Sequence, residues 1–357
     1  MKLTSMSPLL VTVLCLCLAP FAIGVFADDP VKDVPVTEEA ATEEAADDLT
    51  AKFSPPEKLI KADIEEMLQT LSNDGRWGEE DELGTLNLIT PEKRIQAAGL
   101  VQDGVSVSMA HDVVKIEMDG SKPFEHTMMI GLSPDNLSGA GDRYSVEYHG
   151  FAHTHIDALC HMYYKNKMYN GFSAEDIEDT GSPHLGINVL RNGIFTRAVL
   201  MDMPALFGVR YLEGDTAITP EHLDAFEEMA GVRVESGDAL LINTGRWTRR
   251  EIEGEWKIEP GSAGLHASCL PWIKERDVSI IGSDLALDVL PSQVEDFGWP
   301  VHAVTIVGMG MCILDVLDFR EVAELCRSNK RWTFLLTVAP LPVEGGTGSP
   351  INPLATF

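Results

Sequence analysis

The sequence predicts a single α/β domain in which helices flank a mixed β-sheet or a barrel-like β core. After residue 50, short apolar runs typical of strands alternate with longer segments that carry helix signals. Some neighbouring strand segments lie too close in sequence for the long crossover that a parallel pair needs. Part of the sheet is therefore expected to be antiparallel.

Two segments are expected to precede this domain. Residues 1–27 combine Lys2 with a largely apolar stretch that ends in Val-Phe-Ala, which is typical of a cleaved signal peptide. Proline and glycine interrupt the stretch and no basic flank follows it, which argues against a membrane anchor. Residues 28–50 hold nine acids against a single lysine, so we expect an acidic disordered linker. The predicted protein is secreted or periplasmic, without stable membrane insertion, and its folded domain spans 51–357.

Helix signals appear in five places. A Ser-Pro-Pro-Glu capping box predicts a helix over 54–71, and a Thr-Pro-Glu cap predicts a second one over 90–101. The residues between them, 76–88, are expected to form an ordered but irregular loop. Further helices are predicted over 219–229, 265–275 and 319–326.

Strand signals fill the intervals between these helices. The segments are short and rich in β-branched and other apolar residues. They lie at 105–114, 145–149, 197–203, 239–243, 278–282 and 334–339. This alternation of strands with helices is what favours the α/β class.

The composition of the chain limits the classes of molecule that it could bind. The net charge is −29, and no basic stripe is present to neutralise phosphates, which argues against nucleic acid. The four cysteines after the leader share no CxxC spacing, so neither a zinc ribbon nor a redox pair is indicated. We expect Cys160, Cys269, Cys312 and Cys326 to be mostly buried thiols.

Residues 149–161 are the strongest functional signal, because they hold four of the ten histidines and one aspartate. Imidazole and carboxylate together suit Zn, Mn or Fe. If 147–157 is extended, His149, His153, His155 and Asp157 share one face, and residues two apart lie about 6.6 Å from each other at Cα. His155 and Asp157 can then bind one ion, whereas a third ligand from this segment requires a bend.

At these residues the chain resembles the cyclase family of metal-dependent hydrolases, which includes bacterial kynurenine formamidase and isatin hydrolase. Residues 154–161 reproduce most of the second half of the family motif His-x-Gly-Thr-His-x-Asp-x-Pro-x-His, with Leu159 in place of the proline. The likeness runs from about residue 76 to the end of the chain. It includes Arg76-Trp77-Gly78, the segment 238–245, the segment 280–284, Trp299-Pro300-Val301-His302, the segment 311–315 and the glycine-rich segment 345–350.

The resemblance implies a swivelling β/β/α fold, a divalent Zn or Mn ion, a small-molecule substrate and a homo-oligomer. Its metal ligands would be His155, Asp157, His302 and one further group. The implied reaction is metal-assisted hydrolysis of a C–N bond in a formamide or cyclic amide. His161 would move the proton between nucleophile and leaving nitrogen, and Asp315 would complete the metal shell or steer the water.

Two departures from the family pattern matter for the site. Phe151 stands where the family has its first ligand, and a phenyl ring cannot bind an ion. We expect His153 to substitute, with His149 or a water as the alternatives. Asp315 stands where kynurenine formamidases have glutamate. A lactone hydrolase or lyase of the same fold, and a non-catalytic protein that binds a metal or small ligand, therefore stay open as alternatives.

Overall fold

The computed structural model describes residues 53–255, 258 and 261–357. The predicted signal peptide and acidic linker lie outside the described residues. The helices are α2 (Lys61–Thr70), α3 (Pro91–Ala98), α4 (Met203–Phe207), α5 (Pro220–Ala230), α6 (Arg246–Glu253), α7 (Leu270–Glu275), α8 (Pro300–His302) and α9 (Arg320–Asn329), with a π-helix, η6 (Ala303–Gly308), directly after α8. Short 3-10 helices are η1 (Gly84–Leu88), η2 (Tyr169–Gly171), η3 (Ala174–Asp176), η4 (Ile187–Leu190) and η5 (Ala267–Cys269).

The strands form one large sheet and three small pairs. They are β1 (Leu59–Ile60), β2 (Ser106–Ser108), β3 (Glu125–Gly131), β4 (Gly139–Ser145), β5 (His155–Asp157), β6 (Ile194–Asp202), β7 (Ala217–Ile218), β8 (Ala239–Asn243), β9 (Gly264–Leu265), β10 (Ile280–Ser283), β11 (Val294–Glu295), β12 (Ile313–Asp315), β13 (Thr333–Val338), β14 (Gly348–Pro350) and β15 (Leu354–Thr356). The nine-stranded sheet has the order β14-β5-β12-β10-β8-β6-β13-β15-β2.

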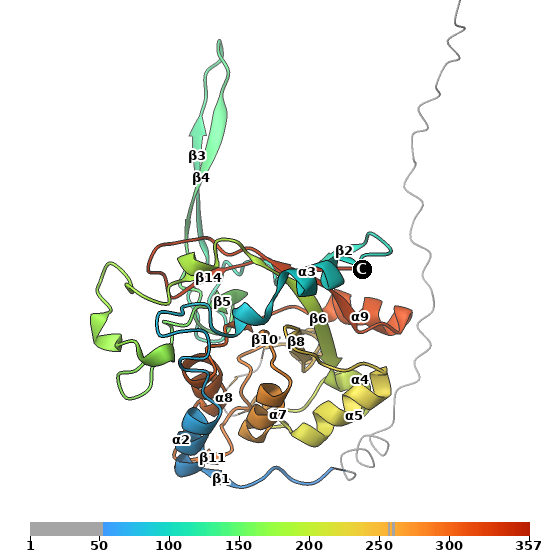
Figure 1. Ribbon diagram of the computed structural model, residues 1–357. Helices are drawn as coiled ribbons and strands as arrows, with labels where there is room; N and C mark the ends of the chain where they lie inside the picture. The colour runs from blue at the N-terminus through green and yellow to red at the C-terminus, as the bar shows by residue number, and fades with distance from the viewer. Residues whose placement is uncertain (1–52, 256–257, 259–260) are drawn as a thin grey trace, which may run out of the picture. The chain divides into compact units, whose positions relative to one another are not determined.

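This sheet is mixed, and it curls into a half-barrel with helices around it (Figure 1). The four central strands β12, β10, β8 and β6 run parallel, whereas β5 and β13 pair antiparallel to the outer two of them. Helices α3 and α5 pack against β6, and α4 packs against β8. The predicted α/β fold with a mixed sheet is therefore confirmed.

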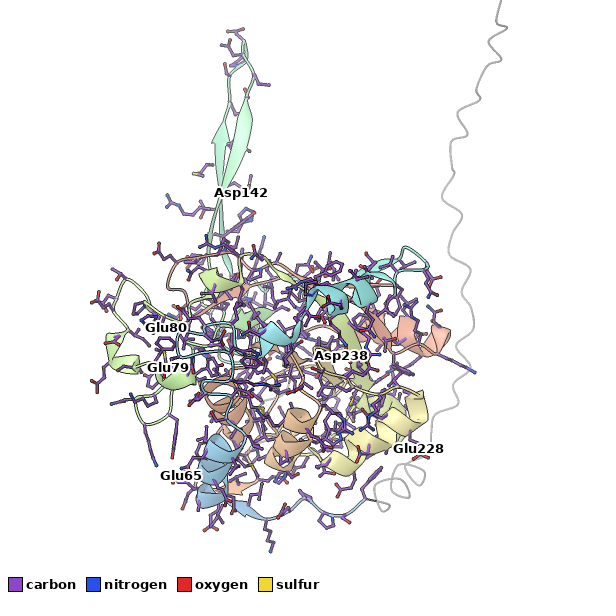
Figure 2. All side chains as sticks on the ribbon, in the orientation of Figure 1. Glu65, Glu79, Glu80, Asp142, Glu228 and Asp238 are labelled. Atoms are coloured by element: carbon purple, nitrogen blue, oxygen red, sulfur yellow. The ribbon has the colours of Figure 1, made fainter. Side chains whose placement is uncertain are left out.

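Burial explains why the central strands were recognisable. Every residue of β8 and β10 is buried, and parallel strands covered on both faces read as continuous apolar runs. Asp238 precedes β8 and is also buried, but its carboxylate pairs with Lys93 and Arg197, each at 2.5 Å. Many other acids lie on the surface, among them Glu79, Glu80 and Glu228 (Figure 2).

Some predicted elements differ from the observed ones. The capping box at Ser54 is wrong, because α2 begins only at Lys61, where the Asp63 carboxylate accepts the Ile60 N–H at 2.8 Å. By contrast, Thr90 caps α3 as expected, since its Oγ1 accepts the Lys93 N–H at 3.2 Å. The predicted strand over 105–114 shortens to β2, and the predicted helix over 265–275 divides into η5 and α7.

The segment before the candidate site also differs from its prediction. No strand forms over 146–154 in the described chain, so the extended segment 147–157 was wrong except at β5. The residues directly before this segment form the β3–β4 hairpin, which ends at Ser145. The hairpin extends away from the sheet (Figure 1) and is exposed on both faces. Gly150, at φ +148°, starts the bend that leads back to β5.

The remaining sequence expectations concern cysteines and membrane helices. Cys160, Cys269, Cys312 and Cys326 are all free and buried, as predicted. Among the described residues, no helix has both the length and the apolar character needed to cross a bilayer.

Candidate metal centre

The middle of the site is built by two paired strands. His155 and Asp157 are two residues apart on β5, so they share one face, and both are buried. Asp315 on β12 lies directly opposite His155 in the antiparallel register. Cross-strand partners have Cβ atoms about 5 Å apart, which brings three polar side chains from distant sequence positions together.

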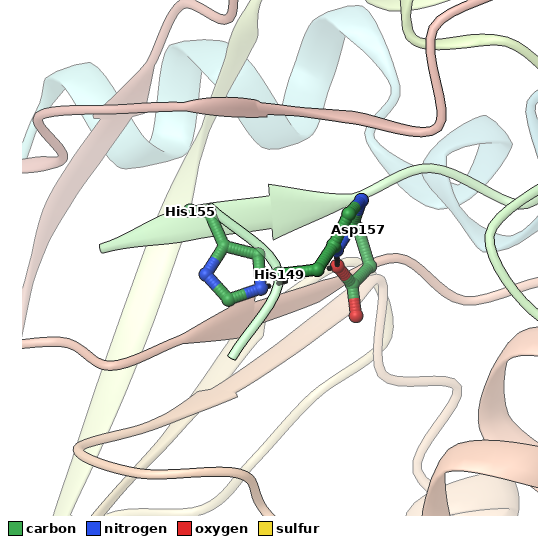
Figure 3. Close-up of side chains that lie close together, drawn as sticks. All are labelled: His149, His155 and Asp157. Carbon is green, nitrogen blue, oxygen red and sulfur yellow. Dashed lines mark ion pairs between the residues drawn. The ribbon is translucent and has the colours of Figure 1, made fainter. Parts of the chain in front are cut away.

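His149 joins this group from the bend (Figure 3). Its Nδ1 lies 2.9 Å from Asp157 Oδ1, and the Nε2 of His155 lies 3.4 Å from the same oxygen. Gly348 of β14 lets the chain approach so closely, since a Cβ there would lie 2.3 Å from the Ile156 carbonyl oxygen and 3.1 Å from His149 Cε1. His149 thus occupies the place next to Asp157 that the sequence predicts for His153.

His153 is directed elsewhere. Its Nε2 lies 3.0 Å from the Lys122 carbonyl oxygen, and its ring meets Phe124 edge to face with centroids 6.3 Å apart. Within the described chain, its side chain makes no hydrogen bond or ion pair with Asp157 or Asp315. The choice of His153 over His149 therefore does not fit the geometry, because the bend at Gly150 breaks the alternation on which that choice depended.

His302 reaches the site from the end of α8. Its Nε2 lies 3.3 Å from Asp315 Oδ2 and 4.0 Å from Asp157 Oδ2. Its Nδ1 lies 2.6 Å from Asp288 Oδ2, and the same carboxylate accepts the backbone N–H groups of Val301 and His302 at 2.7 and 3.1 Å. Asp288 therefore fixes both the helix terminus and the imidazole. Sequence reasoning missed it, since no spacing links an aspartate to a histidine 14 residues later.

Each imidazole presents one nitrogen to the site and ties the other to an oxygen. The Nδ1–H of His155 donates to the His153 carbonyl oxygen at 2.7 Å, which leaves Nε2 facing Asp157. The Nε2 of His149 lies 2.9 Å from Thr347 Oγ1, and Asp288 holds Nδ1 of His302. Such outer contacts set the tautomer and the ring orientation that a metal ligand needs.

The donor atoms fit a cation. One donor atom each from His149, His155 and Asp157 lie within 4.8 Å of one another, as do donor atoms of Asp157, His302 and Asp315. Although His149 Nδ1 and Asp157 Oδ1 are only 2.9 Å apart, neither makes a hydrogen bond to any described residue, and Asp315 Oδ1 lacks one too. Buried carboxylate oxygens are rarely left unsatisfied. Nitrogen and carboxylate donors converging in this way suit a divalent metal ion.

The electrostatics of the cluster favour ionised Asp157. Burial alone would raise its pKa, but contacts with His149 and His155 hold the pKa well below its usual range. Burial likewise acts to lower the pKa of His302, yet hydrogen bonds to Asp288 and Asp315 raise it well above the usual value. The pKa of Asp315 is raised, chiefly because the carboxyl is buried.

His161 lies at the edge of the group. Its Nε2 is 3.8 Å from Asp157 Oδ2, and its ring stacks on His149 with centroids 3.8 Å apart. Burial lowers the pKa of His161 to about 4, so the imidazole is neutral near pH 7. It remains about a quarter exposed, and near pH 7 the neutral ring has one nitrogen free to accept a proton.

Aromatic rings border the site. Phe151 stacks on Trp299 with ring centroids 6.3 Å apart. Trp299 in turn meets the His302 ring edge to face at 5.4 Å. Trp77 lies beside Arg76, which pairs with Asp277 before the amino end of β10. The site borders the carboxyl end of β12, which runs parallel to β10.

Known structures share this fold. A crystal structure described as a novel cyclase is 28% identical, with a TM-score of 0.71 over 80% of this chain and 97% of that chain. Isatin hydrolase A from Labrenzia aggregata is 20% identical, with a TM-score of 0.50 over 72% of this chain and 94% of that one. An isatin hydrolase bound to the product analogue thioisatinate is 17% identical, with a TM-score of 0.50 over 74% and 98% of the two chains.

No curated protein matches the chain. The model of the family described as "Putative cyclase" matches residues 48–288. That segment includes His149, His155, Asp157 and Asp288, and it is more than half of the chain. Together with the structural likeness to a cyclase, this match shows that the chain belongs to the cyclase family.

Proposed function

We propose that this protein is a metal-dependent hydrolase that cleaves the C–N bond of a formamide or a cyclic amide. The observation that carries the proposal is the convergence of His149, His155 and His302 on Asp157, with buried donor atoms left without hydrogen bonds. The fold shared with isatin hydrolases supports the substrate class, since isatin is a cyclic amide.

The proposed ligands are His149, His155, Asp157 and His302. A divalent ion held by them would supply Lewis acidity and a water that ionises near neutral pH. Asp157 brings a full negative charge because its pKa is held low. Asp288 keeps the Nε2 of His302 pointing into the site.

Proton transfer in this reaction is assigned to His161. At pH 7 its neutral ring has one nitrogen free to accept a proton from the attacking water, and the protonated ring is a strong acid because its pKa is low, so it can then deliver that proton to the leaving nitrogen. Asp315, opposite His155, would orient the water through the oxygen that has no hydrogen bond among the described residues.

The direct test is a metal measurement followed by an assay. We expect about one Zn or Mn per chain in purified protein, turnover of N-formylkynurenine or isatin, and loss of both metal and activity in His155→Ala. Turnover of simple lactones alone would favour the lactone hydrolase. Stoichiometric metal without turnover would favour a binding protein, and failure to bind Zn or Mn after reconstitution would refute both enzyme hypotheses.

We also propose that the protein is exported and forms a homo-oligomer. The apolar, cleavable pattern of residues 1–27 supports export, and the first residue of the mature protein is then expected to be Asp28. The exposed apolar side chains of the hairpin, including Ile130, Leu132 and Leu137, support self-association. Amino-terminal sequencing and light scattering after gel filtration test the two points separately.

A further inference from the structure

We infer that Arg246 is a positioning residue that holds the bend at Gly150 so that His149 lies on Asp157. The inference rests on the proposed metal site but concerns a side chain outside it. Arg246 is the first residue of α6, and its side chain is only 2% exposed. Among the described residues, its side chain makes no hydrogen bond or ion pair with any of the proposed ligands.

The guanidinium is anchored on two sides. Nη2 donates to Asp119 Oδ2 at 2.8 Å, and Nη1 donates to the Asp284 carbonyl oxygen at 3.2 Å. The backbone N–H of Arg246 also donates to the Asp284 carboxylate at 2.9 Å, and the guanidinium lies over the Trp247 ring at 4.3 Å. These contacts fix the guanidinium in one place, because its planar fork cannot rotate freely once several donors are engaged.

From that fixed position, Nη2 also donates to the carbonyl oxygen of Phe151. The N–H of the same residue donates to Ser121 Oγ at 3.1 Å. Both polar backbone groups of Phe151 are thus held by side chains from other parts of the chain. Ser121 and Asp119 belong to one turn, closed by the Met118–Ser121 bridge, so Arg246 and this turn grip Phe151 together.

The grip acts two residues from His149. Between them lies Gly150, where a Cβ would come within 2.8 Å of Ser121 Oγ. The bend is therefore packed against the 118–121 turn at Gly150 and hydrogen-bonded to it at Phe151. These contacts restrict the backbone that carries His149 to one conformation. Because Phe151 replaces the family ligand, the chain depends on this path to deliver an imidazole from two positions earlier.

A charge-conserving and a charge-removing variant separate positioning from packing. We expect Arg246→Met to weaken Co²⁺ binding about 10-fold, the lower end of the range for groups that contact a metal ligand directly, because Arg246 acts one step further away, through Phe151. Arg246→Lys should recover little of this, since a single ammonium cannot replace the fork. The matched control is Arg250→Met, because Arg250 also bonds Asp119, at 3.2 Å, but does not bond Phe151.

A double-mutant cycle with His149→Ala tests the route. If Arg246 acts through His149, adding Arg246→Met to His149→Ala should weaken Co²⁺ binding less than about threefold further. The visible Co²⁺ spectrum of Arg246→Met should move toward that of His149→Ala. Additive losses, or an unchanged spectrum, would overturn the inference.

Ser121→Ala removes the other half of the grip without leaving a buried charge, so it remains informative if Arg246→Met fails to fold. We expect Ser121→Ala to weaken Co²⁺ binding about 3- to 10-fold. This loss is smaller than that for Arg246→Met because Ser121 contributes a single uncharged hydrogen bond to Phe151. Hydrogen exchange of metal-free protein should speed up at residues 148–153 in both variants. Wild-type protein that binds no Co²⁺ would refute the proposed function, whereas unchanged exchange at 148–153 would refute the positioning role itself.

Discussion

Replacing His149 and His153 one at a time distinguishes the two candidates for the position next to Asp157. His149 approaches Asp157 at 2.9 Å and its side chain is 28% exposed. His153 is 4% exposed and bonds to the Lys122 carbonyl oxygen instead. His149→Ala should therefore weaken metal binding with little effect on folding, and His153→Ala should do the reverse.

The magnitudes follow from these contacts. Losing an outer-sphere partner costs 10- to 100-fold in metal affinity, so losing His149 as a ligand should cost at least about 100-fold, or roughly 2.8 kcal/mol. His153→Ala removes one hydrogen bond, of about 1 kcal/mol, and leaves a cavity under Phe124. A total of about 2 kcal/mol is expected, which lowers the melting temperature by roughly 4–8 °C.

Competition with a chromophoric chelator gives the affinity, and calorimetric melting of the metal-free protein gives the stability. His126→Ala, on the exposed hairpin, serves as the control for the loss of an imidazole far from the site. A 100-fold loss of affinity in His153→Ala, together with wild-type affinity in His149→Ala, would refute the assignment of His149.

Three further outcomes are expected. Asp288→Asn should weaken metal binding about 10- to 100-fold in the same competition assay, since it loosens His302, and unchanged affinity would contradict the orienting role. His161→Gln should keep the metal but lower kcat about 100-fold or more, the usual contribution of a proton-transfer group; loss of metal would instead make it a ligand. Arg76 lowers the pKa of Asp277 below its ordinary value, so the ion pair stabilises the fold above about pH 4 and this contribution is lost as pH falls through the lowered pKa. Urea unfolding should show Asp277→Asn less stable than wild type by up to about 1 kcal/mol at pH 7, a difference that shrinks as the pH falls below about 4. A difference that stays constant with pH would contradict the ion pair.

The sequence predicts the parts of the fold that depend on local or buried patterns. The apolar run of β8 is legible because both faces of that strand are buried, and Thr90 caps α3 through a hydrogen bond three residues away. The hairpin gives no such signal, since Met128, Met129 and Ile130 follow one another on strands exposed on both faces. Prolines after Ser54 suggested a helix start that α2 does not use.

For the site, the difference lies in the range of the contact. His155 and Asp157 are visible from period-two alternation, which is a property of one short strand. His302 and Asp315 were predicted as site residues only from the family resemblance. Asp315 is brought beside His155 by the order of the strands, in which β12 neighbours β5, and no local sequence pattern indicates that order. The position of His149 depends on a bend held by Arg246 and Ser121, more than 20 residues away in both directions. Alternation could not reveal it.

Because several ionisable side chains are buried together in the site, we expect metal binding to displace protons from the protein. Neighbouring carboxylates raise the pKa of His302 well above its usual value, and Asp157 contacts raise that of His155 despite the opposing effect of burial. A histidine whose pKa is raised keeps its proton to higher pH, so His302 should be protonated at pH 7 in metal-free protein. Coordination needs the lone pair of Nε2, and the proton must then leave.

Metal uptake at pH 7 should therefore release at least about one proton per ion. The measurement is titration calorimetry in two buffers of different ionisation enthalpy, where the difference between the observed heats gives the number of protons released. Asp288→Asn should release fewer protons, because it removes one of the hydrogen bonds that raise the pKa of His302. Equal heats in both buffers would mean that metal binding releases no proton. His302 would then already be neutral in the metal-free protein, which would contradict this prediction.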